Sequence, residues 1–127
     1  YYEDPEEFEM QMDLTREDIS HLIKAKSALL DVNNMLITST TDMDGTNICE
    51  IVFGDNTGFS NKITYQLRGN VSKGDIQIPF DSEVFKDILS ANKDMETGTL
   101  KISEVGMMKL NFTTEETESE YFIARNE

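Results

Sequence analysis

Hydrophobic residues occupy every second position over residues 8 to 13, and this period of two is typical of a half-buried strand. After this strand, hydrophobic residues recur about every 3.6 positions, which is the period of a helix. Thr15 with Asp18 three positions later resembles a capping box, so a helix is predicted from there to about Leu30. Three more segments have strand character and are separated by turn-forming residues, and they span residues 34–40, 46–53 and 60–68.

The same order of elements then begins again. Met10-Gln11-Met12 aligns with Ile76-Gln77-Ile78 at an offset of 66 residues, and hydrophobic positions of the first helix continue the match. The second copy predicts a strand through residues 76–80 and a helix from its cap Asp81 to about Asn92. Strands are then expected at residues 98–104, 106–113 and 119–124.

This pattern predicts an α+β fold made of a duplicated strand-helix-strand-strand-strand unit. Two repeats, at residues 8–69 and 74–125, form one domain over residues 8–127. Because hairpins connect most of the strands, the sheets are expected to be mostly antiparallel. Each helix needs a sheet to cover, so both helices are expected on one side of the sheets.

Helical wheels separate an apolar and a polar side of each predicted helix. The apolar sides should be buried and consist of Ile19, Leu22, Ile23, Leu29 and Leu30 in the first helix and Val84, Phe85, Ile88 and Leu89 in the second. Lys26 falls on the apolar side and is expected to extend its ammonium group out to solvent. The polar sides have basic or small residues along their centre lines, namely Arg16, Ser20, Lys24 and Ser27, and Lys86, Ser90 and Lys93.

The charge of the chain is strongly negative, with a formal net charge of −14. Such a balance argues against nucleic-acid binding, because lysine and arginine must neutralise phosphates. However, ten of the acids lie within residues 1–9 and 115–127, and ten of the eleven bases lie between these segments. Residues 1–7 are acidic, contain Pro5 and predict an extended linker or tail.

Catalytic signals are weak in this sequence. One cysteine, Cys49, and one histidine, His21, disfavour a zinc site and redox chemistry, and no phosphate-binding glycine loop or nucleophile motif is present. We therefore predict a protein that is not an enzyme and needs no cofactor. No segment is long and apolar enough to span a membrane, and an intracellular, cytoplasmic location is expected.

From residue 8 to Arg125 the chain resembles the sliding DNA clamps, particularly the phage replication clamps and proliferating cell nuclear antigen. The resemblance rests on the order and spacing of three stretches. These are Asp13-Leu14-Thr15-Arg16-Glu17-Asp18-Ile19-Ser20-His21-Leu22-Ile23-Lys24-Ala25, the segment from Ile78-Pro79-Phe80 to Ala91, and the final hairpin from Val105-Gly106-Met107-Met108 to Glu120-Tyr121-Phe122-Ile123-Ala124-Arg125.

The resemblance implies a processivity factor whose domains form a closed homo-oligomeric ring, expected to be a trimer, around non-specifically bound duplex DNA. The polar sides of the helices would face the DNA, and the acidic residues would lie outside. DNA polymerase and the clamp loader are the implied partners. If the chain is phage-encoded, the cytoplasm of the infected host is the implied location.

The family also binds partner peptides in an apolar pocket. The resemblance assigns this pocket to Phe8, Gly106, Phe122 and Ala124. Glycine at 106 and arginine at 125 replace prolines that are frequent in the family, and these differences concern the shape of the pocket. For the subunit junction we expect an exposed edge strand in the 46–53 run, with Ile48, Ile51 and Phe53.

A second hypothesis remains open from the residues alone. A duplicated α+β module could bind a protein partner through an exposed sheet edge and have no role on DNA. An acidic chain without a catalytic motif fits this description as well. The helix surfaces and sheet edges are the features that separate the two hypotheses.

Overall fold

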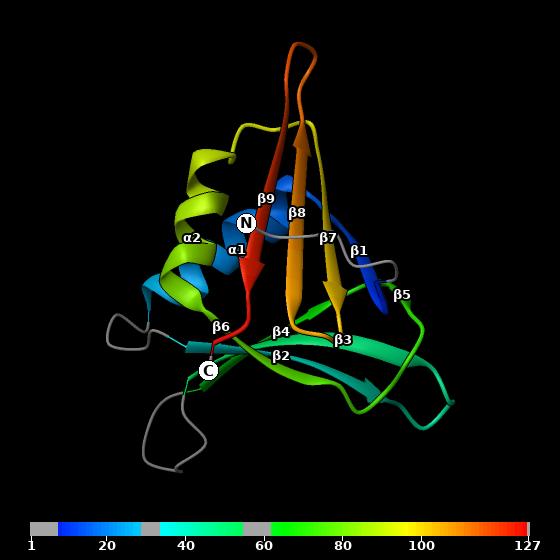
Figure 1. The fold of residues 1–127 in the computed structure, drawn as a ribbon. Helices are drawn as coiled ribbons and strands as arrows, with labels where there is room; N and C mark the ends of the chain where they lie inside the picture. The colour runs from blue at the N-terminus through cyan, green and yellow to red at the C-terminus, as the bar shows by residue number, and fades with distance from the viewer. Residues whose placement is uncertain (1–7, 29–33, 55–61, 127) are drawn as a thin grey trace.

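The computed structural model describes residues 8–28, 34–54 and 62–126, and these form an α+β structure with two helices and two antiparallel sheets (Figure 1). The predicted acidic tail at 1–7 lies outside the described residues, as do Leu29, Leu30 and the start of the predicted 60–68 strand. The α+β class predicted from the hydrophobic pattern is confirmed.

The elements follow the predicted order, with one addition. The short strand β5 (Gly69–Val71) lies between the two halves of the chain and was not predicted. The other elements are β1 (Met10–Leu14), α1 (Arg16–Ser27), β2 (Asn34–Thr41), β3 (Asn47–Gly54), β4 (Lys62–Leu67), β6 (Gln77–Asp81), α2 (Ser82–Ala91), β7 (Thr97–Ser103), β8 (Met107–Thr113) and β9 (Glu118–Ala124).

The two sheets have corresponding strand orders. One sheet runs β5-β1-β7-β8-β9, and the other runs β4-β3-β2-β6. In both, the strand that precedes one helix pairs with the strand that follows the other helix, as Met12 with Leu100 and Ile78 with Ile37. Each sheet therefore combines strands from both halves of the chain, and neither half could form its sheet alone.

The core lies between the inward faces of the two sheets and the helices. Alternation along β1 and β8 places Met12 and Leu110 inside at 0% exposure, and the outward neighbours are more accessible. Phe53, Phe80, Phe85 and Phe112 are the largest side chains that are fully buried in the described part of the chain.

Both predicted helix starts are confirmed. The hydroxyl of Thr15 accepts from the backbone N–H of Asp18 at 3.0 Å, and the Asp18 carboxylate accepts from the Thr15 N–H, which completes the capping box. The carboxylate of Asp81 caps α2 by accepting from the N–H groups of Glu83 and Val84.

The helices pack against each other and run in opposite directions. At the start of α1, the Arg16 guanidinium donates to the backbone carbonyl of Met95 at 2.8 Å, just beyond the end of α2. At its other end, the Lys26 ammonium lies 3.3 Å from the carboxylate of Glu83, in the first turn of α2. In each contact the start of one helix meets the end of the other, so the two helices are antiparallel. Figure 1 shows the two helices side by side next to the upright strands β7, β8 and β9.

The prediction that the Lys26 side chain extends out to solvent was wrong. This side chain is only 3% exposed, and its partner Glu83 is half exposed. The ammonium is retained between the helices because a carboxylate from the neighbouring helix neutralises it there. A helical wheel of α1 contains no information about that carboxylate.

Candidate functional surfaces

The exposed side of α1 matches the predicted polar side. Arg16, Ser20, Lys24 and Ser27 are all exposed. The guanidinium of Arg16 is nevertheless engaged by the backbone of the loop after α2, and Glu17 is exposed on the same helix. Lys24 is consequently the one lysine that α1 presents to solvent, since Lys26 is buried.

The exposed side of α2 differs from its prediction. Phe85 and Leu89 are buried as expected, but Val84 is 43% exposed. Lys86 and Ser90 are only half exposed, and the solvent-facing side carries Glu83 and Asp87 instead; Lys93, beyond the end of the helix, is exposed. The predicted centre line through Lys86 and Ser90 was therefore wrong for α2. Ser82, which precedes the apolar residues, is fully buried as well. The buried side of the helix therefore extends toward Lys86 and Ser90.

The predicted subunit edge at Ile48, Ile51 and Phe53 was also wrong. These residues belong to β3, which pairs with β2 on one side and β4 on the other. Ile51 and Phe53 are buried because an interior strand that faces the core is covered by its neighbours, and Ile48 is half buried. Among the described residues, β4 is the outermost strand next to β3, and β9 is the corresponding outermost strand of the other sheet.

Two of the residues predicted to form a peptide pocket, Phe122 and Ala124, lie on the outward side of the five-stranded sheet. Phe122 and Ala124 are half exposed on β9, and Ala124 pairs with Met107 of β8. Gly106 forms the turn between β7 and β8 with a φ of +104°, and its carbonyl accepts from the Arg125 N–H. A Cβ at 106 would lie 2.4 Å from the Arg125 side chain, so this glycine allows the C-terminal segment to cross close to the turn.

Phe8, the fourth predicted pocket residue, is not adjacent to Phe122. It precedes β1, and its ring lies 5.8 Å from the ammonium of Lys101 on β7. The Phe122 ring lies 5.5 Å from the ammonium of Lys109 on β8. Lys101 and Lys109 are direct cross-strand partners, and they separate the two rings. The structure thus brings Gly106 and Ala124 together but sets Phe8 apart from them by two strands.

Sequence reasoning missed this arrangement, which we term the lysine row. It crosses four neighbouring strands through the pairs Gln11 with Lys101, Lys101 with Lys109 and Lys109 with Phe122. Both lysines are half buried, and Lys109 also lies 3.3 Å from the carboxylate of Glu120. The sequence could have predicted the pairing of the two lysines. A hairpin with its turn near residue 105 pairs residues that lie at equal distances on either side of the turn, as Lys101 and Lys109 do.

A second missed cluster joins α1 to the outermost strand β4. The Tyr65 hydroxyl donates to the Asp18 carboxylate at 2.5 Å and lies 3.4 Å from Nδ1 of His21, whose ring meets the tyrosine ring edge-on. Burial and the hydrogen bond to the Asp18 carboxylate raise the pKa of Tyr65. His21 is exposed and contacts a neutral phenol, so this arrangement positions β4 against the helix.

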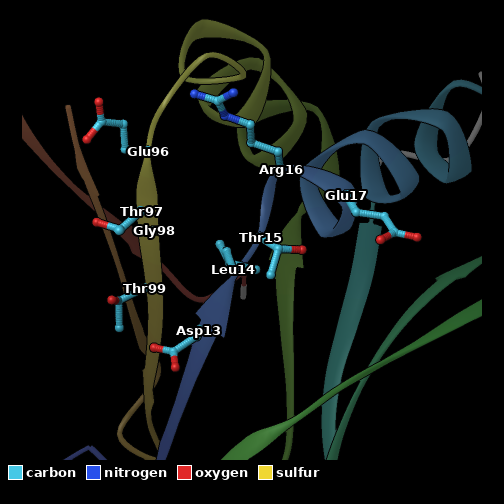
Figure 2. A pocket seen from close by; sticks show the side chains of 9 residues that line it. All are labelled: Asp13, Leu14, Thr15, Arg16, Glu17, Glu96, Thr97, Gly98 and Thr99. Atoms are coloured by element: carbon cyan, nitrogen blue, oxygen red, sulfur yellow. The ribbon is translucent and has the colours of Figure 1, made fainter. Parts of the chain in front are cut away.

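An open hollow of about 670 Å³ lies where β1 ends, α1 begins and β7 begins (Figure 2). Three of its lining residues are acids, Asp13, Glu17 and Glu96. Figure 2 shows the carboxylates of Glu17 and Glu96 pointing away from each other on opposite sides, and the Arg16 side chain reaching toward α2. Because Glu17 and Glu96 diverge, these two carboxylates do not form a pair for acid–base chemistry.

Within the parts of the chain that the structure describes, no group of histidine, cysteine, aspartate and glutamate side chains is arranged to hold a metal ion. Cys49 is fully buried on β3, and burial raises the pKa of its thiol to about 12. A thiol with such a pKa is a poor nucleophile at neutral pH. None of the described helices is long and apolar enough to cross a membrane.

Comparison of the chain with protein-family models and with curated proteins finds no match to either.

Proposed function

We propose that this chain is a domain of a sliding DNA clamp, a non-enzymatic processivity factor that holds replication proteins on duplex DNA. The observation that carries this proposal is the correspondence between the two halves of the fold. Their sheets have matching strand orders, β1-β7-β8-β9 and β6-β2-β3-β4, and their helices pack together in opposite directions. This is the architecture that a duplicated clamp unit requires.

The sheet edges support assembly into a ring. β4 and β9 hold equivalent places, each the last strand of its half and each outermost in its sheet among the described residues. A strand with one unpaired side can extend a sheet in a neighbouring subunit. Joining β9 of one domain to β4 of the next is a head-to-tail contact, and such contacts produce closed rings when the rotation per subunit closes. This junction replaces the incorrect one on β3.

The DNA-facing surface of the proposal is the helix pair. Lys24 of α1 and Lys93, beyond the end of α2, are exposed, and Lys86 on α2 is half exposed. A ring holds DNA by its topology, so a few weak phosphate contacts are sufficient and need no sequence specificity. DNA polymerase and clamp-loader segments are proposed to bind the outer corner formed by Met107, Phe122 and Ala124.

One observation favours the second hypothesis, an interaction module without a role on DNA. Glu83 and Asp87 face solvent on α2, where acidic groups would repel phosphates. Half of the proposed DNA-facing surface thus carries mixed charge. The two hypotheses differ in whether the protein remains bound to DNA that has no ends.

The test uses the protein that carries this chain, assembled with its clamp loader on nicked circular DNA. We expect the protein to stay bound to the circle in high salt and to dissociate when the DNA is linearised, because only a topological link depends on DNA ends. Lys24→Glu should lower DNA synthesis per binding event roughly threefold, as expected for the loss of phosphate contacts.

The matched control is Lys73→Glu, which changes the charge equally at an exposed lysine outside the helices. It should leave synthesis unchanged. Equal retention on circular and linear DNA, or equal effects of the two variants, would contradict the clamp proposal. Binding of a protein partner without any retention on DNA would support the interaction module.

A further inference from the structure

The sulfur atoms of this chain differ sharply in their access to solvent. They belong to seven methionines and one cysteine, all within the described residues. Met107 is half exposed on β8, and Met43 is fully exposed. The other methionines are buried in the core at no more than 2% exposure, namely Met10, Met12, Met35, Met95 and Met108. An oxidant dissolved in water therefore meets one methionine long before the rest.

Met43 stands at the tip of the hairpin between β2 and β3. Figure 1 shows this tip at the end of the four-stranded sheet that points away from both helices. The Asp42 carboxylate holds the turn by accepting from the N–H groups of Asp44 and Thr46, each at 2.9 Å. The Asp42 N–H also donates to the Thr46 carbonyl at 2.8 Å. None of these bonds uses the side chain of Met43, so a change at its sulfur atom leaves the turn intact.

The buried sulfur atoms are protected for two different reasons. A sulfoxide in the core would bury a polar oxygen without a hydrogen-bond partner, so a methionine such as Met12 reacts only when the core opens. Cys49 is fully buried on β3, and burial raises the pKa of its thiol to about 12. The thiolate, which is the form that reacts with oxidants, is consequently scarce at neutral pH.

The charges around Met43 select among oxidants. Asp42 and Asp44 flank it and are both exposed, and the whole chain has a formal net charge of −14. This negative field repels an anionic oxidant but does not act on a small neutral one such as hydrogen peroxide. The thioether sulfur attacks one peroxide oxygen, so that an S–O bond forms and the O–O bond breaks. The proton of the transferred hydroxyl passes to the other oxygen, which leaves as water. Sulfur is oxidised and the peroxide is reduced.

We propose that Met43 is a reversible oxidation site, at which a neutral hydroperoxide converts the thioether to a sulfoxide while the protein stays folded. The new oxygen faces water and needs no partner within the protein. Methionine sulfoxide reductases, which return the sulfoxide to a thioether, can reach it for the same reason. This site is separate from the helix pair and the sheet edges, and it is independent of the proposed clamp function.

The test treats the purified protein with hydrogen peroxide and follows each methionine by peptide mass spectrometry. Met43 should gain the first oxygen, Met107 the next, and the buried methionines should react only when the protein unfolds. The singly oxidised protein should keep the Tm of the untreated protein, and methionine sulfoxide reductases should remove the added oxygen. In urea, where burial is lost, all of the methionines should react at similar rates.

Met43→Leu removes the sulfur atom from the tip and keeps an apolar side chain of similar size. It should abolish the fast phase of oxidation, and the matched control Met107→Leu should retain it. A first oxygen on Met107 or on a buried methionine, or a fast phase that persists in Met43→Leu, would overturn the proposal. A lowered Tm after the first oxygen would overturn it too. The same preference for Met43 in urea would also do so, because the fold would then not be the source of the selectivity.

Discussion

The two helices have corresponding places in the fold but present different surfaces. Lys24 is the exposed lysine of α1, and the polar side predicted for this helix agrees with the structure. On α2 the exposed residues include Glu83 and Asp87, and Lys86 is half buried. Equivalent topology therefore does not produce equivalent electrostatics, because each helix rotates to suit the residues it packs against.

This difference also explains why a buried cation occurs between the helices. Lys26 at the end of α1 is 3% exposed and pairs with Glu83 at the start of α2. Glu83 lies on the exposed side of α2 because Ser82, Phe85 and Leu89 define the buried side. The rotation of one helix thus supplies the counter-charge that the other needs.

Two substitutions on α2 test the rotation of this helix directly and should differ most in stability. Phe85→Ala should lower the free energy of unfolding by about 3–5 kcal/mol, because it removes a fully buried ring and leaves a cavity. Val84→Ala should change it by less than about 0.5 kcal/mol, since Val84 is 43% exposed. Urea unfolding of both variants measures the difference. Similar losses would show that α2 buries both side chains, as the helical wheel predicted.

The contact between the helices gives the second effect. Glu83→Ala should lower the free energy of unfolding by about 1–3 kcal/mol, because it leaves the buried Lys26 ammonium without this carboxylate. Lys26→Met should cost less, since the uncharged side chain needs no counter-charge. The measurement is chemical denaturation at neutral pH. A larger loss in Lys26→Met than in Glu83→Ala would contradict this account.

The helix caps give a smaller effect and compare the same feature in both halves. Asp81→Ala should cost about 1–2 kcal/mol, because one carboxylate caps two N–H groups of α2. Thr15→Ala should cost about 1 kcal/mol or less, because Asp18 still accepts from the Thr15 N–H. Thermal unfolding of the two variants compares them. A greater loss for Thr15→Ala would show that the reciprocal box is the stronger cap.

The smallest effect concerns two tyrosines on the outermost strands. Tyr65→Phe should cost about 1 kcal/mol, because the Tyr65 hydroxyl donates to the Asp18 carboxylate. Tyr121→Phe should cost less, since the Tyr121 hydroxyl meets a neutral amide, that of Asn92, at 3.2 Å. Denaturation at neutral pH compares the two variants, and equal losses would contradict the stronger role of Tyr65.

The pKa of Tyr65 adds a dependence on pH. It is raised in the folded protein above its ordinary value of 10.0. The folded state thus keeps a proton that the unfolded state loses, so the stabilisation is complete below about pH 10 and is lost as the pH rises through the folded pKa. The decline of stability above pH 10 should be shallower in Tyr65→Phe. An unchanged slope would exclude the contribution of Tyr65.

Local patterns predicted much of the fold. The alternation in β1, the strand β8 and the caps at Thr15 and Asp81 depend on neighbours within a few residues, and all were predicted with boundaries close to those observed. The β5 strand was missed because three residues, Gly69–Val71, are too few to show a period. The lysine row could have been found by pairing residues across the predicted turn.

Other features could not be read from local patterns. The apolar sequence of β3 predicts a strand but does not distinguish an edge strand from an interior one, because the same residues suit both places. Its position was decided by β4, which pairs with it from Cys49 to Gly54. The pocket residue Phe8 likewise has a partner, Lys101, that is distant in sequence.

The α+β class, the order of the predicted helices and strands and the positions of both helix caps follow from the sequence alone. Periodicity and capping depend on residues that are close together in the chain. The rotation of α2, the burial of Lys26 and the outermost places of β4 and β9 were set by tertiary packing. These depend on which distant segments meet. Packing selects one arrangement for the whole chain.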